Sequence, residues 1–200
     1  MRLPESLRRP DWLKEMQAVL AIALAAVLAL GVVAPALRAA IAEELPLELP
    51  AAALSGTLDY ELREGVAIAA EQDVTVTLAD PDAGQRAAWA LAELPTQAVA
   101  AALLALLLGL VRHARRENPF TSDTVRRLRA VAATAIAGGV FAFTVELLAS
   151  MHLSTTAVVG DVVGISHLPV HWLLIGFGLL AVAEVVKRGR AMREELETVV

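Results

Sequence analysis

Apolar residues gather in four long runs along this chain, and polar residues fill the segments between them. The runs cover residues 17–37, 91–111, 131–150 and 168–186. A helix needs about 20 apolar residues to cross the hydrocarbon core of a bilayer, which is about 30 Å thick. Each run is close to this length, so the pattern predicts four transmembrane helices. We expect a mainly α-helical integral membrane protein with a single membrane domain over residues 1–200.

The overall composition argues against burying these runs inside a water-soluble protein. Of the 200 residues, 57% are hydrophobic, whereas soluble domains are about 45–50% apolar. Too little polar chain remains to coat a soluble core built from four such helices. The basic start of the chain also imitates a secretory signal peptide, but its apolar run is longer than a signal core of about 7–15 residues. We therefore expect a retained first span.

The basic residues divide the connections into two kinds. Lys and Arg are concentrated in residues 1–16, 112–130 and 187–200, whereas residues 151–167 contain neither. Residues 38–90 contain three arginines against ten acidic residues. Cytoplasmic loops carry the Lys/Arg excess in membrane proteins. This predicts cytoplasmic N- and C-termini, with basic loops that lie against anionic lipid headgroups rather than binding nucleic acid directly.

The long external connection, residues 38–90, contains the strand patterns. Val74, Val76 and Leu78 alternate with threonines, which is typical of a half-buried strand. We expect residues 66–70 to pair with this strand as a hairpin, and residues 45–49 and 58–62 to add edge strands. So small an extracytoplasmic sheet is marginal alone. It is expected to rest on the bilayer, on the span ends, or on a second copy in a homo-oligomer.

The start of the second span has its own local pattern. Asp80 is expected to cap the helix, with Pro81 in the first turn. The helix should run through Trp89, an interface anchor, into the second apolar run. Pro95 lies inside that helix and predicts a kink.

Two ionisable residues lie within the third and fourth runs, where such side chains are costly. Glu146 is one turn before the outer end of the third run, and His171 is just inside the outer end of the fourth. Antiparallel packing would bring them to a similar depth. Thr134, Gly138 and Ala142 precede Glu146 at four-residue spacing, which predicts a small-residue stripe for close helix packing.

Three interpretations of this polar pair remain open. In the first, each group lies at headgroup level and is hydrated separately. Alternatively, Glu146 and His171 form an ion pair that acidification would strengthen, which would give a pH switch. The third interpretation is a divalent metal site that adds His167 to the pair. The residue types favour the first, and we assign no metal ligand.

The sequence contains no pattern that indicates an enzyme. It has no cysteine, and no Ser/His pair, paired catalytic acids or Gly-rich phosphate loop occurs at a shared depth. We therefore expect a non-enzymatic protein with no catalytic residues and no cofactor.

Two cytoplasmic stretches carry recognisable motifs. Residues 118–129 read Asn-Pro-Phe-Thr-Ser-Asp-Thr-Val-Arg-Arg-Leu-Arg, and the tail has a basic turn around Gly189. Pro119 prevents the preceding helix from continuing, and Thr121 or Ser122 can cap the next helix. We expect these stretches to form a partner surface, with the candidate residues Pro119, Phe120, Arg127, Arg129, Arg188 and Arg190.

These stretches resemble a bacterial membrane family catalogued as domain of unknown function 2975. The shared elements are Pro-Phe-Thr followed by Arg-Leu-Arg before the third span, a basic glycine-containing turn after the fourth, and a Glu…Thr-Val ending. The residues that match are Pro119, Phe120, Thr121, Arg127, Leu128, Arg129, Glu184, Arg188, Gly189, Glu194, Thr198 and Val199. The resemblance implies a bacterial plasma-membrane protein with four spans, and a cytoplasmic helix-turn-helix regulator as a partner.

Two functional hypotheses follow from these observations. The first is a sensory, regulatory or partner-docking membrane module, in which the external segment detects a ligand and the inner basic surface engages a partner. The second is a small transporter, immunity or channel-like protein in which Glu146 and His171 face a polar path.

Overall fold

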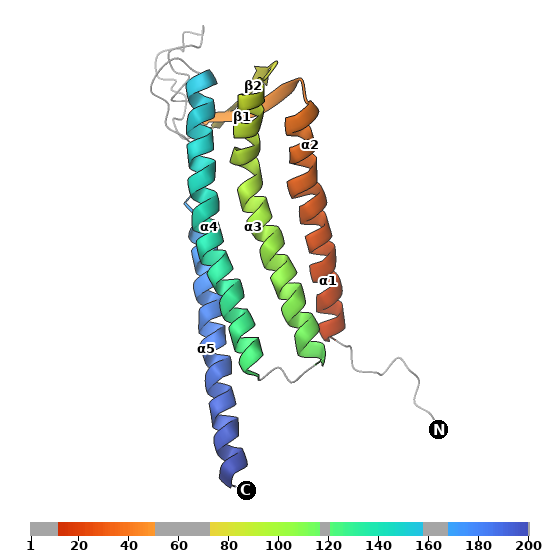
Figure 1. The fold of residues 1–200 in the computed structure, drawn as a ribbon, viewed down its shortest axis with the longest axis vertical. Coiled ribbons are helices and arrows are strands. Elements are labelled where there is room, and N and C mark those ends of the chain that lie inside the picture. The colour runs from red at the N-terminus through yellow and green to blue at the C-terminus, as the bar shows by residue number, and fades with distance from the viewer. Residues whose placement is uncertain (1–11, 51–72, 117–120, 158–167, 200) are drawn as a thin grey trace, which may run out of the picture.

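The protein is a bundle of long helices with a two-stranded sheet at one end (Figure 1). The computed structural model describes residues 12–50, 73–116, 121–157 and 168–199. Its elements in chain order are α1 (Trp12–Ala26), η2 (Val27–Val33), α2 (Ala34–Ile41), β1 (Glu44–Pro50), β2 (Asp73–Ala79), α3 (Ala83–Arg116), α4 (Ser122–Ala157) and α5 (Val170–Val199).

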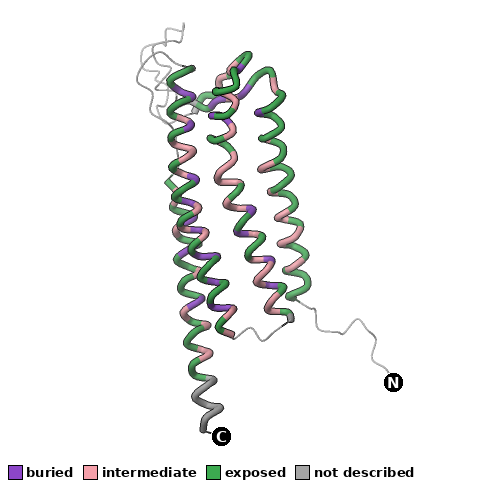
Figure 2. Tube along the Cα trace, viewed as in Figure 1, coloured by how far each residue is buried: buried purple, intermediate pink, exposed green. Residues whose placement is uncertain are grey.

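The four predicted spans are confirmed as helices long and apolar enough to cross a membrane. The first span is continuous over Trp12–Ile41, and it contains one π-helical segment, η2. Figure 2 shows buried residues spaced along α3 and α4, whereas α1 and η2 have none. The mainly α-helical membrane fold with a small sheet between the first two spans is therefore the observed one.

The sequence dictates where α3 and α4 begin. The backbone N–H of Gln85 donates to Asp82 Oδ1 at 2.8 Å, and the N–H of Asp82 donates to Gln85 Oε1 at 2.9 Å. This reciprocal pair is a capping box. The cap is thus Asp82, and the prediction of Asp80 was wrong: Asp80 has a φ of 50°, directly follows β2, and donates its backbone N–H to the carbonyl of Glu43. At α4 the N–H of Thr124 donates to Thr121 Oγ1 at 3.3 Å, so Thr121 is the cap.

The sheet pairs β1 with β2 in antiparallel fashion, with Leu45 opposite Leu78 and Leu47 opposite Val76. The predicted strand over residues 74–78 is confirmed. Its partner in the described chain is β1, which the sequence indicated only as an edge strand. The expected companion, residues 66–70, lies outside the described residues, as do residues 58–62.

The sheet rests on the span ends, one of the three supports that the sequence left open. Leu45 and Leu47 of β1 are buried against Trp89 of α3 and Leu153 of α4. In addition, Arg86 Nη1 donates to the carbonyl of Ala39 at the end of α2, at 3.0 Å. We call this end of the bundle the sheet end. The opposite end, where α3 ends and α4 begins, is the basic end.

Small residues let α4 pack closely on both of its neighbours. A Cβ at Gly138 would lie 3.1 Å from Val99 of α3, and one at Gly139 would overlap Trp172 of α5. Because Trp172 meets Gly139, α5 begins beside the middle of α4, and it continues past the start of α4 at the basic end (Figure 1). Of α5, therefore, only the first turn approaches the sheet end.

Candidate functional site

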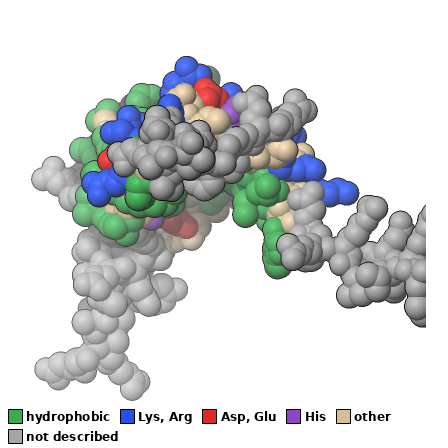
Figure 3. Space-filling model, turned by 90° about the horizontal axis from the view of Figure 1, so that it is seen from below, with side chains coloured by type: hydrophobic (Ala, Val, Ile, Leu, Met, Phe, Trp, Pro, Cys, Tyr) green, Lys and Arg blue, Asp and Glu red, His purple; other side chains and the backbone are tan. Residues whose placement is uncertain are grey.

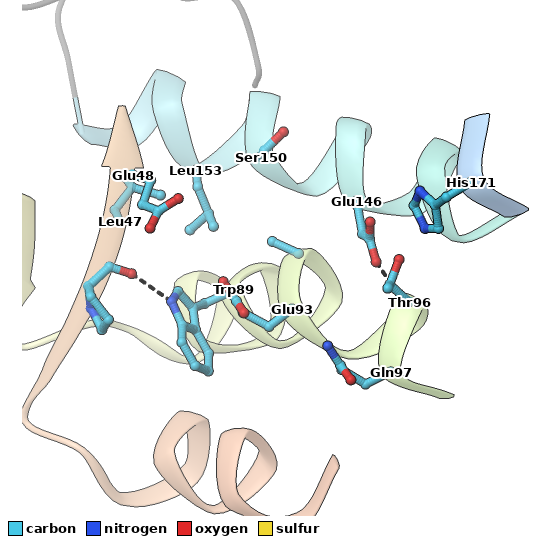
Figure 4. Close-up of a pocket in the computed structure, with 12 residues that line it drawn as sticks. Leu47, Glu48, Trp89, Glu93, Thr96, Gln97, Glu146, Ser150, Leu153 and His171 are labelled. Atoms are coloured by element: carbon cyan, nitrogen blue, oxygen red, sulfur yellow. Dashed lines mark hydrogen bonds between the residues drawn. The ribbon is translucent and has the colours of Figure 1, made fainter. Parts of the chain in front are cut away.

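A pocket of about 460 Å³ lies at the sheet end, between the sheet and the upper parts of the bundle (Figure 4). Its walls come from β1, α3, α4 and the first turn of α5. The polar side chains that line it are Glu48, Glu93, Thr96, Gln97, Glu146, Ser150 and His171. Trp89, Leu47 and Leu153 supply apolar walls. Three carboxylates from three different elements give the pocket an acidic character.

Glu146 joins α4 to α3 inside this pocket. Its Oε1 accepts a hydrogen bond from the backbone N–H of Thr96 at 2.7 Å. Thr96 follows Pro95, which has no N–H and disturbs the hydrogen-bond ladder of α3 around it. The carboxylate therefore satisfies a backbone donor beside the proline of a helix that continues through it. A hydrogen bond to an ionised acceptor is stronger than a neutral one, so this contact offsets part of the cost of a carboxylate at this depth.

Trp89 fixes the strand wall of the pocket. Its Nε1 donates to the carbonyl of Pro46 at 2.7 Å, and the side chain is 5% exposed. This bond links α3 to β1 across 43 residues of sequence. Because Pro46 precedes Leu47 and Glu48, Trp89 determines where these two pocket residues lie.

His171 lines the same pocket as Glu146, and the two are brought to one cavity as their positions predicted. Figure 4 shows Glu146 reaching from α4 to Thr96, with His171 beyond it at the start of α5. The His171 ring lies 4.9 Å, between centroids, from that of Trp172. Glu146 and His171, both described, form no hydrogen bond or ion pair with each other. The Glu146 carboxylate accepts from the Thr96 N–H instead.

The metal interpretation gains no support from the part of the chain that the structure describes. Within these residues no group of three His, Cys, Asp or Glu side chains could hold a metal ion. His167, the third ligand in that interpretation, lies outside the described residues.

The basic end carries a second set of charged contacts. Asp123 Oδ2 accepts from Arg127 Nε at 2.5 Å, Asp123 also bonds Arg126, and it lies 3.3 Å from His113 Nε2. Glu184 of α5 faces Arg129 of α4 at 3.7 Å. Further pairs from Glu184 within α5 are Lys187 at 3.9 Å and Arg188 at 3.4 Å. Figure 3 views the molecule from this end and shows Lys and Arg side chains around it.

The candidate partner residues Arg127, Arg129, Arg188 and Arg190 all lie at the basic end, on α4 and α5. Pro119 and Phe120 lie outside the described residues. The structure thus brings the basic candidates of the two motifs to one end of the molecule, although they are about 60 positions apart in the sequence.

Comparison with known families matches residues 82–200 to the model described as Protein of unknown function (DUF2975). The match covers more than half of the chain, from the cap of α3 to the C-terminus. The chain belongs to this family. We found no match among curated proteins or solved structures.

The family match divides the pocket into two parts. Glu93, Thr96, Glu146 and His171 lie within the matched residues, on α3, α4 and α5. The strand wall, with Glu48, precedes the match. The helices of the matched region thus supply one side of the pocket, and the segment between the first two spans supplies its strand side.

Sequence reasoning found Glu146 and His171 but missed Glu93 and Gln97. A usable indication was present: Trp89, Glu93 and Gln97 follow one another at four-residue spacing, which places all three on one face of α3. Taken alone, an acid near the end of an apolar run indicates only the membrane interface. Glu48 could not be found in this way, since its strand had no assigned partner.

Proposed function

We propose that this protein is a non-enzymatic sensory or regulatory module of the bacterial plasma membrane. In this proposal the sheet end faces the exterior and receives a ligand in its pocket. The basic end faces the cytoplasm and engages a partner protein. The excess of Lys and Arg at one end of the bundle supports this orientation.

The observation that carries the proposal is that four elements, β1, α3, α4 and α5, meet at the pocket. Glu146 on α4 contacts Thr96 on α3 at 2.7 Å, and α4 continues without interruption from Glu146 to Arg129 and Ser122. A ligand that enters between these helices would change the contact of Glu146. A rigid helix would then carry that displacement to the basic end, as small shifts of packed helices do in known switches.

The packing beneath the pocket favours a receptor over a transport path. Toward the basic end, the next buried layer consists of Leu103 on α3, Val131 and Ala135 on α4, and Trp172 on α5. Val99 packs against the same cluster. The parts of a pore that select ions or solutes are lined by polar groups, whereas this layer of described side chains is apolar apart from the Trp172 indole N–H.

We propose a cytoplasmic helix-turn-helix regulator as the partner, as the family resemblance implies. The candidate surface contains four arginines, Arg127, Arg129, Arg188 and Arg190, together with Pro119 and Phe120. Arginine suits a protein interface because its planar guanidinium pairs with carboxylates through two hydrogen bonds. Truncation after Val186 removes Arg188 and Arg190, so the truncated protein should fail to capture the partner that the solubilised full-length protein captures.

The absence of cysteine makes a direct test of coupling practicable. Spin labels on Ala130→Cys and Ala191→Cys, two exposed positions of α4 and α5 near the basic end, report the distance between these helices in lipid nanodiscs. We expect Glu146→Gln to change the distance distribution, because it removes the pocket charge that contacts α3. The matched control is Glu44→Gln, an exposed acid of the sheet outside the pocket, which should leave it unchanged.

Two results would contradict the proposal. Identical distance distributions for the labelled protein with and without Glu146→Gln would show that the pocket and the basic end are not coupled. Solute or ion flux into proteoliposomes that Glu146→Gln abolishes would favour the transporter hypothesis instead.

A further inference from the structure

A second hollow, of about 320 Å³, lies at the basic end between α4 and α5. It is lined by Ser122, Val125, Arg126, Arg129, Lys187 and Arg190. We call it the α4–α5 groove. Two cationic side chains come from each helix, a hydroxyl lies beside them, and the one apolar lining residue, Val125, is buried. This donor set is suited to an oxyanion.

The carboxylates near the groove do not balance its charge. Six cationic side chains lie on the parts of α4 and α5 that border the groove: Arg126, Arg127, Arg129, Lys187, Arg188 and Arg190. In the part of the chain that the structure describes, Asp123 on α4 pairs with Arg126 and Arg127, and Glu184 on α5 pairs with Arg129, Lys187 and Arg188. Two carboxylates thus share five cations, and a net positive charge remains around a hollow that is large enough for a phosphate group.

The existing ion pairs leave two of the groove cations available to an incoming anion. Arg129 and Lys187 lie 3.7 and 3.9 Å from Glu184, beyond hydrogen-bond distance, and their side chains are 52% and 58% exposed. Exposed pairs of this kind contribute little to stability. Both side chains can therefore turn toward an anion without breaking a hydrogen bond. The groove also adjoins the N-terminus of α4, where the helix dipole favours negative charge.

The surroundings of the groove fit a phospholipid rather than a small soluble anion. On α4, Ala130, Ala133 and Ala137 follow Arg126 at helical spacing and are all exposed. On α5, Val182 and Val186 precede Arg190 at four-residue spacing, and Val182 is 50% exposed. Both walls of the groove thus continue into the spans as apolar surface, which could hold acyl chains beside a bound headgroup.

We propose that the α4–α5 groove is a phosphate-binding site for the headgroup of an anionic phospholipid. Basic pockets between transmembrane helices are known to hold such headgroups. The site is separate from the pocket at the sheet end, and it shares Arg129 and Arg190 with the partner surface proposed above, whereas Arg126 and Lys187 belong to the groove alone. It would fix α4 against α5 at the membrane boundary.

The test titrates the full-length protein in detergent with phosphatidylglycerol and measures occupancy by native mass spectrometry. Phosphatidylcholine and inorganic phosphate are titrated in parallel. We expect phosphatidylglycerol to bind more tightly than either. The double substitution Arg126→Gln and Lys187→Gln should weaken it about 30-fold, which equals about 2 kcal/mol for two cations near an anionic lipid. The matched control, Lys14→Gln with Arg112→Gln, removes the same charge at the same end but outside the groove and should change affinity less than about threefold.

A second variant protects the test against a folding defect. Ser122→Glu places a carboxylate in the groove, at a helix N-terminus where an acid is tolerated, and should repel the headgroup while the protein stays folded. Equal losses in the groove and control variants would overturn the proposal, as would equal binding of phosphatidylcholine. Binding of inorganic phosphate as tightly as the lipid would assign the groove to a free anion and overturn the lipid assignment.

Discussion

The two ends of the bundle make polar contacts of different kinds. At the sheet end, the bonds from Arg86 to Ala39, Trp89 to Pro46 and Thr96 to Glu146 join residues 43 to 50 positions apart. All three are partly buried. At the basic end, Asp123 and Glu184 pair mainly with residues three or four positions away on their own helices, and most of the basic partners are about half-exposed or more.

This difference separates contacts that hold the fold from contacts that can be exchanged. A partly buried bond between distant segments restricts the chain, and its loss leaves an unpaired polar group. An exposed pair within one helix is worth little and is screened by salt. The sheet end should therefore be sensitive to single substitutions, and the basic end should tolerate them while its charges remain free to bind ligands.

The largest expected effect comes from the contact between α4 and α5 that connects the two ends. Gly139→Ala should lower the free energy of unfolding by about 3 kcal/mol or more, because the added Cβ would overlap Trp172 and force the helices apart. Thermal unfolding in detergent, followed by circular dichroism, measures this.

Gly178→Ala on α5 is the matched control, since an added Cβ there meets no atom within 4 Å. It should be neutral or stabilising by up to about 1 kcal/mol, as alanine is in a helix interior. Equal destabilisation by both substitutions would show that the α4–α5 contact is not the closely packed one described above.

A smaller effect is expected from removing the acceptor of the Thr96 N–H. Glu146→Leu should destabilise the protein by about 2 kcal/mol, because it leaves a partly buried donor unpaired beside Pro95. Glu146→Gln keeps an acceptor oxygen and should stay close to the wild type in thermal unfolding. If the glutamine variant were as unstable as the leucine variant, the charge rather than the hydrogen bond would hold α4 to α3.

The sequence predicts the helices well because the bilayer fixes their length. The runs over 91–111 and 131–150 lie within α3 and α4, and the run over 17–37 lies within the continuous first span. The run over 168–186 begins two residues before α5. The helices extend beyond these runs, since capping at Asp82 and Thr121 starts α3 and α4 outside the apolar segments. Two aspartates flank Pro81, and local propensity alone does not decide which one caps.

The sheet and the pocket are less accessible to sequence reasoning. Alternation marks residues 74–78 as a strand, but a period of two does not choose a partner among several short candidates. The placement of β1 depends on Trp89, whose N–H reaches Pro46 across 43 positions. This contact between distant segments cannot be predicted from the sequence. The pairing of Glu48 with Glu93 and Glu146 in one pocket was therefore not predicted, and Glu146 was the one pocket acid that the sequence indicated.

The strand wall provides a further test of the sheet end. Trp89→Phe should cost about 1 kcal/mol, because it removes the donor to Pro46 and keeps most of the buried ring. Hydrogen exchange of the amides in β1 and β2 should become faster, while exchange in α5 should not change. Unchanged exchange in the strands would mean that Leu45 and Leu47 hold the sheet in place without this bond.

The smallest effect on stability is expected at the basic end, from Glu184→Gln. The substitution removes the carboxylate that faces Arg129, Lys187 and Arg188, yet these pairs are exposed and 3.4 Å or longer. The free energy of unfolding should change by less than about 1 kcal/mol. Binding of phosphatidylglycerol should become tighter, because Glu184 no longer competes for the two groove cations Arg129 and Lys187. A marked loss of stability would show that the basic end supports the fold as the sheet end does, and unchanged lipid binding would separate Glu184 from the groove.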